Sequence, residues 1–182
     1  MAVINIKGDL SAIERALKQE PKFAKAAAVS ALNKTIAQAQ TAGVRELARR
    51  KNLPVRLVKR RTKLQRANQR RLVATLIALT AGIPIDQMKY SATLKRGVTA
   101  AGARYPHAFT ALVGAAKPLV FERKSVNGAR VARLPIERVK IPIRVPAETI
   151  FQAAVGNAVR TKLESIFERE LRFRVARRAA NS

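Results

Sequence analysis

A run of cations without a single carboxylate sets the first limit on how this chain can fold. Residues 49–71, RRKNLPVRLVKRRTKLQRANQRR, hold eleven Lys or Arg, and no Asp or Glu occurs between Glu46 and Asp86. Charged side chains of one sign repel one another and are almost never fully buried without a partner. We therefore expect this segment to lie on the surface of the protein.

The composition of the whole chain extends this argument to partners. The 182 residues include 37 Lys and Arg against 11 Asp and Glu, a formal net charge of +26, whereas a free-standing small domain is best served by a magnitude of ~2–8. Repulsion among so many positive charges works against a compact state unless an anionic partner screens it. The composition therefore favours a component that binds nucleic acid or acidic neighbouring subunits. The length predicts a single domain, residues 1–182.

Several features that the sequence lacks narrow the class of protein. There is no cysteine, which excludes disulfides and thiolate metal sites. No apolar run reaches the ~18 residues of a membrane span, and the start, MAVINIKGDLSAIE, lacks the basic and apolar regions of a signal peptide. We expect a protein that is made in a cytoplasm and has no membrane partner.

Helical patterns occupy the first third of the chain. The capping-box spacing in SAIE predicts a short helix over residues 11–19. Apolar residues then recur at helical spacing and predict one long helix over residues 21–50, with Gly43 as a weak point. Asn52 with a proline two residues later indicates a stop and a new helix over about residues 54–67.

The pattern changes beyond residue 71, where short apolar runs bounded by Gly and Pro predict strands. Pro135 and Pro142 indicate edge or irregular strands, because proline cannot donate to a ladder. Residues 93–107, rich in Gly and Pro, predict a mobile loop, and Pro146 begins a helix of some thirty residues. The order of elements predicts an α+β fold, in which long N-terminal and C-terminal helices pack with a small, mainly antiparallel β-sheet.

The last helix is where we expect copies of the chain to meet. Its apolar stripe rotates around the helix axis, so either Gly156 and Asn157 kink the helix or its two halves meet different surfaces. Such a stripe exposes more apolar area than one compact domain of this size covers. We expect copies to pack side by side as a ring through five residues: Phe151, Val155, Leu163, Ile166 and Phe167.

The basic segment is the predicted nucleic-acid contact. A helix over residues 54–67 would turn Leu57, Val58 and Leu64 toward the core and its cations outward. Cations on one face suit a phosphate backbone, because neutralising it releases counterions. The alternative is an ordinary solvated face, although such faces mix charges of both signs. The residues expected to contact polyanions are Arg56, Lys59, Arg60, Lys63, Arg66, Arg70 and Arg71.

Catalytic chemistry has little support. His107 is the only histidine, and the sequence has neither a Gly-rich phosphate loop nor a Gly-x-Ser-x-Gly elbow. Glu168 and Glu170 lie two residues apart on a predicted helix, so their carboxylates face different directions. We expect no enzyme, no metal and no cofactor.

The segment VFERK…RLPIERVKIPIRVP, residues 120–146, carries a more specific signal. An Arg-bearing strand, Leu-Pro-Ile, and then Lys-Ile-Pro and Val-Pro leading into a C-terminal helix resemble the phage minor tail protein Z family, also called tail completion proteins, of lambda-like long-tailed phages. The stretches AAAVSALNKT and LPVRLVKRR are similar to the first half of the same family. The resemblance covers about residues 20–175.

This resemblance implies a virion component at the head-proximal end of the tail, the neck. There it would complete the tail, join it to the head and place the end of the genome in the tail channel. The implied partners are other neck and tail proteins, such as the tail terminator and the head–tail connector proteins, and viral genomic DNA bound without sequence specificity. The alternative is a cytoplasmic, non-specific nucleic-acid-binding protein of ribosomal or chromatin-like type.

Overall fold

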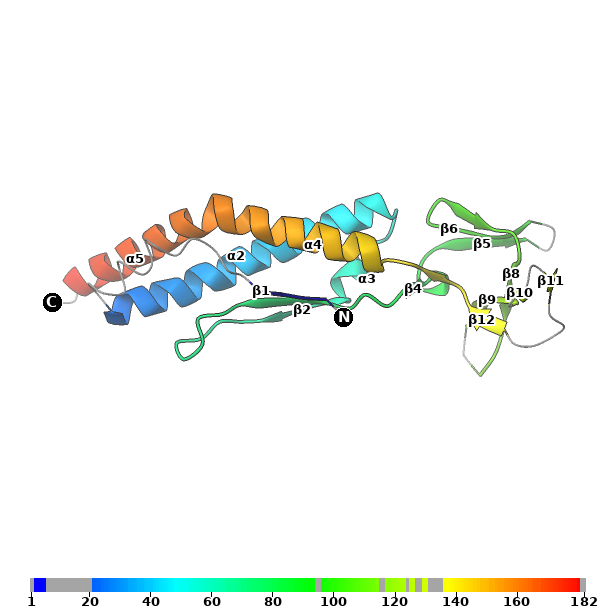
Figure 1. Cartoon of the computed structure of the whole chain (residues 1–182), viewed down its shortest axis with the longest axis horizontal. Coiled ribbons are helices and arrows are strands. Elements are labelled where there is room, and N and C mark those ends of the chain that lie inside the picture. Colours follow the sequence, from blue (N-terminus) through cyan, green and yellow to red (C-terminus); the bar gives the residue numbers. More distant parts are fainter. Residues whose placement is uncertain are drawn as a thin grey trace.

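The computed structural model describes residues 2–5, 21–93, 96–114, 117–123, 125–126, 129–130 and 136–180. The short helix predicted over residues 11–19 lies outside them. The molecule is elongated, with a pair of long helices and a small sheet at one end and a group of short strands at the other (Figure 1). The predicted α+β class, with long N-terminal and C-terminal helices and small antiparallel sheets, is confirmed.

Helix α2, Pro21–Arg50, confirms the predicted long helix. Its buried face is rich in alanine, and these small side chains let other helices approach closely. The helix ends where Asn52 adopts the left-handed conformation, with φ 51°. The N–H of Leu53 donates to the carbonyl of Ala48 (2.8 Å) and that of Asn52 to the carbonyl of Arg49 (3.3 Å), which is a Schellman cap.

The C-terminal helical segment runs antiparallel to α2 and is interrupted by a π-helical turn (Figure 1). It comprises α4, Arg144–Ala158, the π turn η2, Val159–Leu163, and α5, Glu164–Ala179. A π turn inserts one extra residue, which rotates every later side chain by about 100° around the axis. This insertion explains the rotation of the apolar stripe, and both α4 and α5 pack on α2. The π turn begins just after Gly156 and Asn157, and both halves of the segment meet α2, while α4 also meets β1 and β3.

The predicted contact between copies was wrong, because the stripe forms core within one chain. Its five residues are all buried, and the largest of them, Phe151 and Phe167, are 1% and 2% exposed. They belong to one apolar cluster with the buried face of α2. The stripe looked too wide for one domain only because the sequence did not reveal that α2 runs along its whole length.

At Gly43, α2 and α4 approach each other closely. A Cβ atom placed there would lie 2.5 Å from Cδ1 and 2.7 Å from Cε1 of the Phe151 ring. Real Cβ atoms do not approach carbon so closely, so the absence of a side chain is what lets the ring lie against the backbone of α2. Gly43, predicted as a weak point of the helix, is therefore the position against which the Phe151 ring packs.

A three-stranded antiparallel sheet packs against the helix pair (Figure 1). Its order is β1-β3-β2, with Leu64 opposite Leu76 in the β2–β3 pairing. The strands are β1, Ala2–Asn5, β2, Thr62–Gln65, and β3, Thr75–Ala78.

The helix predicted over residues 54–67 was wrong beyond its first turn. Helix α3 covers only Val55–Lys59, and β2 follows within three residues. Along β2, half-buried Thr62 and Leu64 alternate with exposed Lys63 and Gln65, which is the period of a strand. Pairing with β3 supplies the backbone hydrogen bonds that a continuing helix would otherwise have made.

The far end of the molecule is built from short antiparallel strands (Figure 1). One sheet has the order β5-β6-β7 and another the order β12-β9-β8, while β13 pairs with β4 and β10 with β11. A one-turn 3-10 helix, η1, Ile85–Gln87, follows β4. The strands are β4, Ile83–Pro84; β5, Tyr90–Thr93; β6, Gly97–Ala100; β7, Ala103–Tyr105; β8, Ala108–Ala111; β9, Leu119–Arg123; β10, Ser125–Val126; β11, Ala129–Arg130; β12, Ile136–Arg138; and β13, Lys140–Ile141.

The loop predicted over residues 93–107 was wrong, because β6 and β7 form a tight hairpin there. Its two turn residues both have positive φ, 52° at Ala101 and 77° at Gly102. This is the conformation of a type I′ turn, whose twist matches that of the paired strands. Of the two prolines predicted to mark edge or irregular strands, Pro135 lies outside the described residues. The strand β12, which begins at the next residue, lies at the edge of its sheet, and Pro142 directly follows β13 of the two-stranded pair β13–β4.

One ion pair joins β12 to the 3-10 helix η1. Arg138 on β12 donates two hydrogen bonds to Asp86 in η1, one of them 2.9 Å from Nε to Oδ1. The carboxylate of Asp86 is almost fully buried, and its hydrogen bonds raise the pKa of Arg138. The pair joins segments 52 residues apart in the chain.

A second charged cluster joins α5 to α2. Glu170 accepts hydrogen bonds from Lys34 of α2 and from Arg174 one turn further along α5, the latter at 2.7 Å. Arg174 also donates to the hydroxyl of Ser30 at 2.7 Å. The hydrogen bond from Lys34, and then that from Arg174, lowers the pKa of Glu170 below its ordinary value.

We expect this cluster to make stability depend on pH in the acid range. Because the folded-state pKa of Glu170 is depressed, its contribution is fully present above its unfolded value, 4.5, and is lost as the pH falls through the folded pKa. Urea unfolding of wild type and Glu170→Gln should therefore differ at neutral pH and converge in acid. A difference that persists unchanged to acid pH would contradict the role assigned to this carboxylate.

Within the part of the chain that the structure describes, no helix is both long enough and apolar enough to cross a membrane.

Candidate anion-binding surface

All seven cations predicted to contact polyanions are exposed, but instead of one helix face they occupy a short helix, one strand at an edge of the sheet and the connection that follows this strand. Strand β2 has a neighbour on one side only, so it forms that edge. We call this set the basic edge. Arg56, Lys59 and Arg60 lie in or next to α3, Lys63 lies on β2, and Arg66, Arg70 and Arg71 lie in the β2–β3 connection.

Helix α3 is held by the two residues that the sequence assigned to its inner face. Leu57 and Val58 are buried in the core, as predicted. The third predicted inner residue, Leu64, is half-buried on β2 and packs against the same cluster. Arg61 is half-buried, and its carbonyl accepts a hydrogen bond from the N–H of Leu79 at 2.8 Å. These contacts fix the path of the chain from α3 into β2, and they leave Arg60 and Lys63 exposed.

The β2–β3 connection is anchored to α2 by one side chain, that of Asn33. Its Nδ2 donates to the carbonyl of Ala67 at 3.1 Å, and its Oδ1 accepts from the N–H of Ala67 at 2.8 Å. This amide satisfies both backbone groups of a buried residue, as a neighbouring strand would. Arg66, which follows the last residue of β2, is therefore adjacent to a backbone position that Asn33 holds in place.

The tip of the connection is shaped by a second asparagine. The Oδ1 of Asn68 accepts from the N–H groups of Arg70 (2.9 Å) and Arg71 (2.8 Å). The backbones of Asn68 and Arg71 also exchange hydrogen bonds, at 3.0 and 3.1 Å. The turn is thus closed by its own side chain, a common use of Asn. It holds two arginines side by side in solvent.

Sequence reasoning missed the residues that position the basic edge, although the signal was present in Leu32-Asn33-Lys34. Leu32 is buried, Asn33 holds Ala67, and Lys34 pairs with Glu170. An asparagine in the middle of a long helix is unusual, because its side chain competes with the helix backbone. Such a residue points to a tertiary hydrogen bond, but not to its partner.

The carboxylates of the described residues do not neutralise the basic edge. The described residues include eight carboxylates, of which Glu46, Asp86, Glu148, Glu168 and Glu170 form ion pairs with other cations. No ion pair joins any cation of the basic edge to a carboxylate in the described ranges. The charge of this surface is therefore available to an external anion.

The predicted absence of a metal site concerns the acidic side chains and the single histidine. No group of three or more His, Asp or Glu side chains is close enough to hold a metal ion among the described residues. His107 is exposed between β7 and β8. The seven cations of the basic edge are exposed.

Comparison of the chain with known proteins identifies its family. Comparison with curated proteins, and with solved structures, finds no match. The family described as prophage minor tail protein Z (GPZ) matches residues 6–179. The match includes α2, the basic edge and residues 120–146, which carried the resemblance in the sequence. It confirms that resemblance. The chain therefore belongs to the prophage minor tail protein Z family, and it is a structural component of a phage tail.

Proposed function

We propose that this tail protein acts in the neck, at the head-proximal end of the tail, where it completes the tail and joins it to the head. In this role the basic edge contacts the viral genomic DNA or acidic neck proteins and helps to place the end of the genome in the tail channel. The observation that carries the proposal is the exposed charge of the basic edge, which forms no ion pair with any carboxylate that the structure describes. Family membership supports a virion role over the alternative of a free cytoplasmic nucleic-acid-binding protein.

The shape of the basic edge favours DNA as one of its partners. Its cations are spread over α3, β2 and the connection to β3, so they can meet several phosphates along a rod-like polyanion. The basic edge has no aromatic residue on which a base could stack, which favours contact with the backbone over single-strand binding. Binding of this kind is independent of base sequence.

We further propose that several copies surround the channel as a ring, assembled in the host cytoplasm before they enter the virion. The tail terminator and the head–tail connector proteins are the proposed neighbours. Since the rotating stripe is core, copies must meet through other surfaces. A net charge of +26 per chain means that DNA or acidic neighbours have to neutralise such a ring.

A simpler reading of the basic edge is protection of the sheet. Lysine on an edge strand discourages pairing with other chains, and Lys63 occupies such a position. This reading accounts for Lys63 but not for Arg66, Arg70 and Arg71, which lie beyond the strand and therefore protect no ladder. Binding measurements separate the two interpretations.

Replacing Lys63, Arg66, Arg70 and Arg71 by Gln should weaken the binding of duplex DNA and flatten its salt dependence. Each lost phosphate contact lowers the slope of log K against log salt by about 0.9. The slope is measured by titrating a fluorescent duplex at several salt concentrations. Circular dichroism should remain that of the wild type, because these four side chains are exposed.

The matched control removes the same charge elsewhere. Replacing Lys22, Lys25, Arg169 and Arg177 by Gln also takes away four exposed cations, but from α2 and α5. The control should retain most of the wild-type slope. If both variants lose the same slope, the DNA responds to net charge alone and the basic edge is not its site.

A further inference from the structure

We infer that copies of this chain meet through the free edge of β8, where a strand of the next copy pairs. The inference rests on the ring proposed above, because it names the surface that joins neighbouring copies. Strand β8 pairs with β9 only, so its other side is an edge of the sheet β12-β9-β8. Among the described residues, no further backbone hydrogen bond involves residues 108–113. The outward backbone groups of β8 can therefore pair with a strand from another molecule.

The segment around β8 carries no charge. Residues 105–116, YPHAFTALVGAA, contain no Lys, Arg, Asp or Glu, although 26% of the whole chain is charged. The neighbouring strand β9 adds Glu122 and Arg123, whose charges cancel. The edge of β8 is therefore a neutral surface on a chain with a net charge of +26.

The other edge strands are protected against pairing with another chain. Each has a charged side chain within it or directly beside it: Lys63 on β2, Arg104 on β7, Glu137 and Arg138 on β12, and Lys89 before β5. Charges on an edge strand discourage the addition of a further strand. Among the edge strands of three or more residues whose side chains the structure describes, β8 alone has no charge in it or next to it.

Two exposed apolar side chains continue the edge beyond the end of β8. Leu112 is 69% exposed and Val113 is 53% exposed. Gly114 follows, and a Cβ atom placed there would meet no atom within 4 Å, so this part of the chain borders open space. Phe109, earlier on the same edge, is half-buried. A strand that pairs with β8 would cover these apolar side chains, which favours the pairing.

The lack of charge favours another copy of this chain as the partner. An acidic protein or DNA gains most from a surface that is rich in cations, such as the basic edge. Two copies repel each other wherever their cations face one another. A contact that is neutral and apolar avoids this repulsion. The edge of β8 is therefore suited to a partner whose charge has the same sign.

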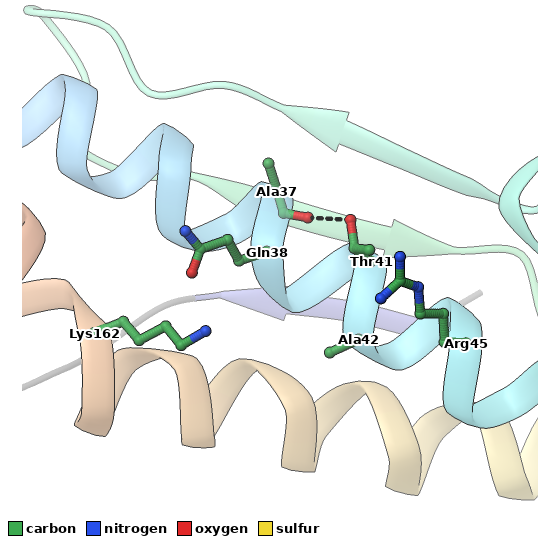
Figure 2. A pocket seen from close by; sticks show the side chains of 6 residues that line it. All are labelled: Ala37, Gln38, Thr41, Ala42, Arg45 and Lys162. Carbon is green, nitrogen blue, oxygen red and sulfur yellow. Dashed lines mark hydrogen bonds between the residues drawn. The ribbon is translucent and has the colours of Figure 1, made fainter.

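The shallow recess between α2 and the π turn lacks this property. Figure 2 shows Arg45 on α2 and Lys162 on the π turn, one on each side of the recess. Both side chains are exposed. Two copies that met at this recess would bring cations of the same sign together. Contact between copies is therefore disfavoured there.

The first test measures self-association of the full chain by sedimentation velocity at low and high salt. Salt takes the place of the anionic neighbours, because the Debye length falls from about 10 Å at 0.1 M to about 3 Å at 1 M. Repulsion between copies is then screened, whereas an apolar contact remains. We expect monomers at low salt and oligomers at about 1 M salt. Binding of DNA has the opposite salt dependence, so the two contacts can be distinguished.

Replacing Leu112 and Val113 together by Lys should weaken this association at high salt by about a hundredfold. Each apolar side chain that is buried in a contact contributes a factor of about ten. Circular dichroism should remain that of the wild type, because both side chains are exposed. The matched control, Phe173→Lys with Val175→Lys, adds the same charge at two exposed apolar positions of α5. This control should associate almost as the wild type does.

A local reporter tests whether the contact lies at β8. The chain has no cysteine, so Thr110→Cys introduces a single thiol at an exposed position of the strand. Alkylation of this thiol by N-ethylmaleimide, a neutral reagent, should be several-fold slower in the associated protein. A thiol at Ser165→Cys, exposed on α5, corrects for the effect of salt on the reaction itself.

Four results would overturn the inference. Equal association of the wild type and the Leu112→Lys, Val113→Lys variant places the contact elsewhere and leaves the ring proposal standing. An unprotected thiol at position 110 in the oligomer has the same meaning. Rapid disulfide formation between two Thr110→Cys copies indicates a two-fold dimer, because a ring joins two different patches. Monomers at every salt concentration would contradict the ring proposal itself, and the inference with it.

Discussion

Replacing Leu163 and Phe167 together by Asp is expected to unfold the protein. Both side chains are 2% exposed and belong to the apolar cluster between α5 and α2. Each Asp would place an uncompensated charge in that cluster, at a cost of several kcal/mol. A typical domain is stable by only about 5–15 kcal/mol, so little folded protein should remain. Loss of the helical circular dichroism signal in purified protein measures the effect.

The control places the same two charges on the opposite side of the helical segment. Thr161→Asp with Ser165→Asp has the same four-residue spacing, and both positions are exposed. This variant should fold with nearly the stability of the wild type. A soluble, folded Leu163→Asp, Phe167→Asp protein that fails to enter virions would contradict the structure, and would restore the stripe as an interface between copies.

Gly43→Leu should destabilise the packing of α2 against α4. A Cβ alone would lie 2.5 Å from the ring of Phe151, which is 1% exposed. A leucine side chain adds three further carbons in the same direction. Overpacking costs about 1–3 kcal/mol and occasionally more, and the gain in helix propensity over glycine is about 1 kcal/mol. We expect a net loss of about 2 kcal/mol in the free energy of unfolding, because the overpacking cost exceeds the gain in helix propensity.

Two variants make this prediction specific to the Gly43–Phe151 contact. Ala42→Leu introduces the same side chain one residue earlier, at an exposed position, and should change stability little. Phe151→Ala alone should cost about 3–5 kcal/mol, but it also makes room for a side chain at position 43. The double variant should therefore be more stable than the sum of the two single effects predicts. Strict additivity in urea unfolding would show that the two residues are not coupled.

The long helices and the inner face of α3 could be predicted because their signals are local. The apolar spacing from Pro21 to Arg50 and the burial of Leu57 and Val58 depend on neighbours within one or two turns. The exposure of the basic edge was predictable for a similar reason, since unpaired cations are rarely buried anywhere. The family resemblance came from proline and isoleucine positions near strand ends.

The errors share a physical cause, which is that the deciding interactions are distant in sequence. Residues 62–65, TKLQ, are compatible with a helix by composition, yet they form a strand. Their backbone groups find partners on β3, where Leu64 lies opposite Leu76. The hairpin of β6 and β7 was missed because an alanine occupies a left-handed turn position, which composition does not reveal.

The sequence by itself determined which side chains of this tail protein must reach solvent and which must be buried, because charge and apolar area set those costs residue by residue. It did not determine what covers the buried ones. Only the tertiary structure decided that α2 covers the rotating stripe, with the π turn, Val159–Leu163, restoring the register. Likewise, Asn33 anchors the basic edge only because Ala67, 34 residues away, comes within hydrogen-bonding distance. Such contacts depend on how whole elements pack, which no local pattern contains.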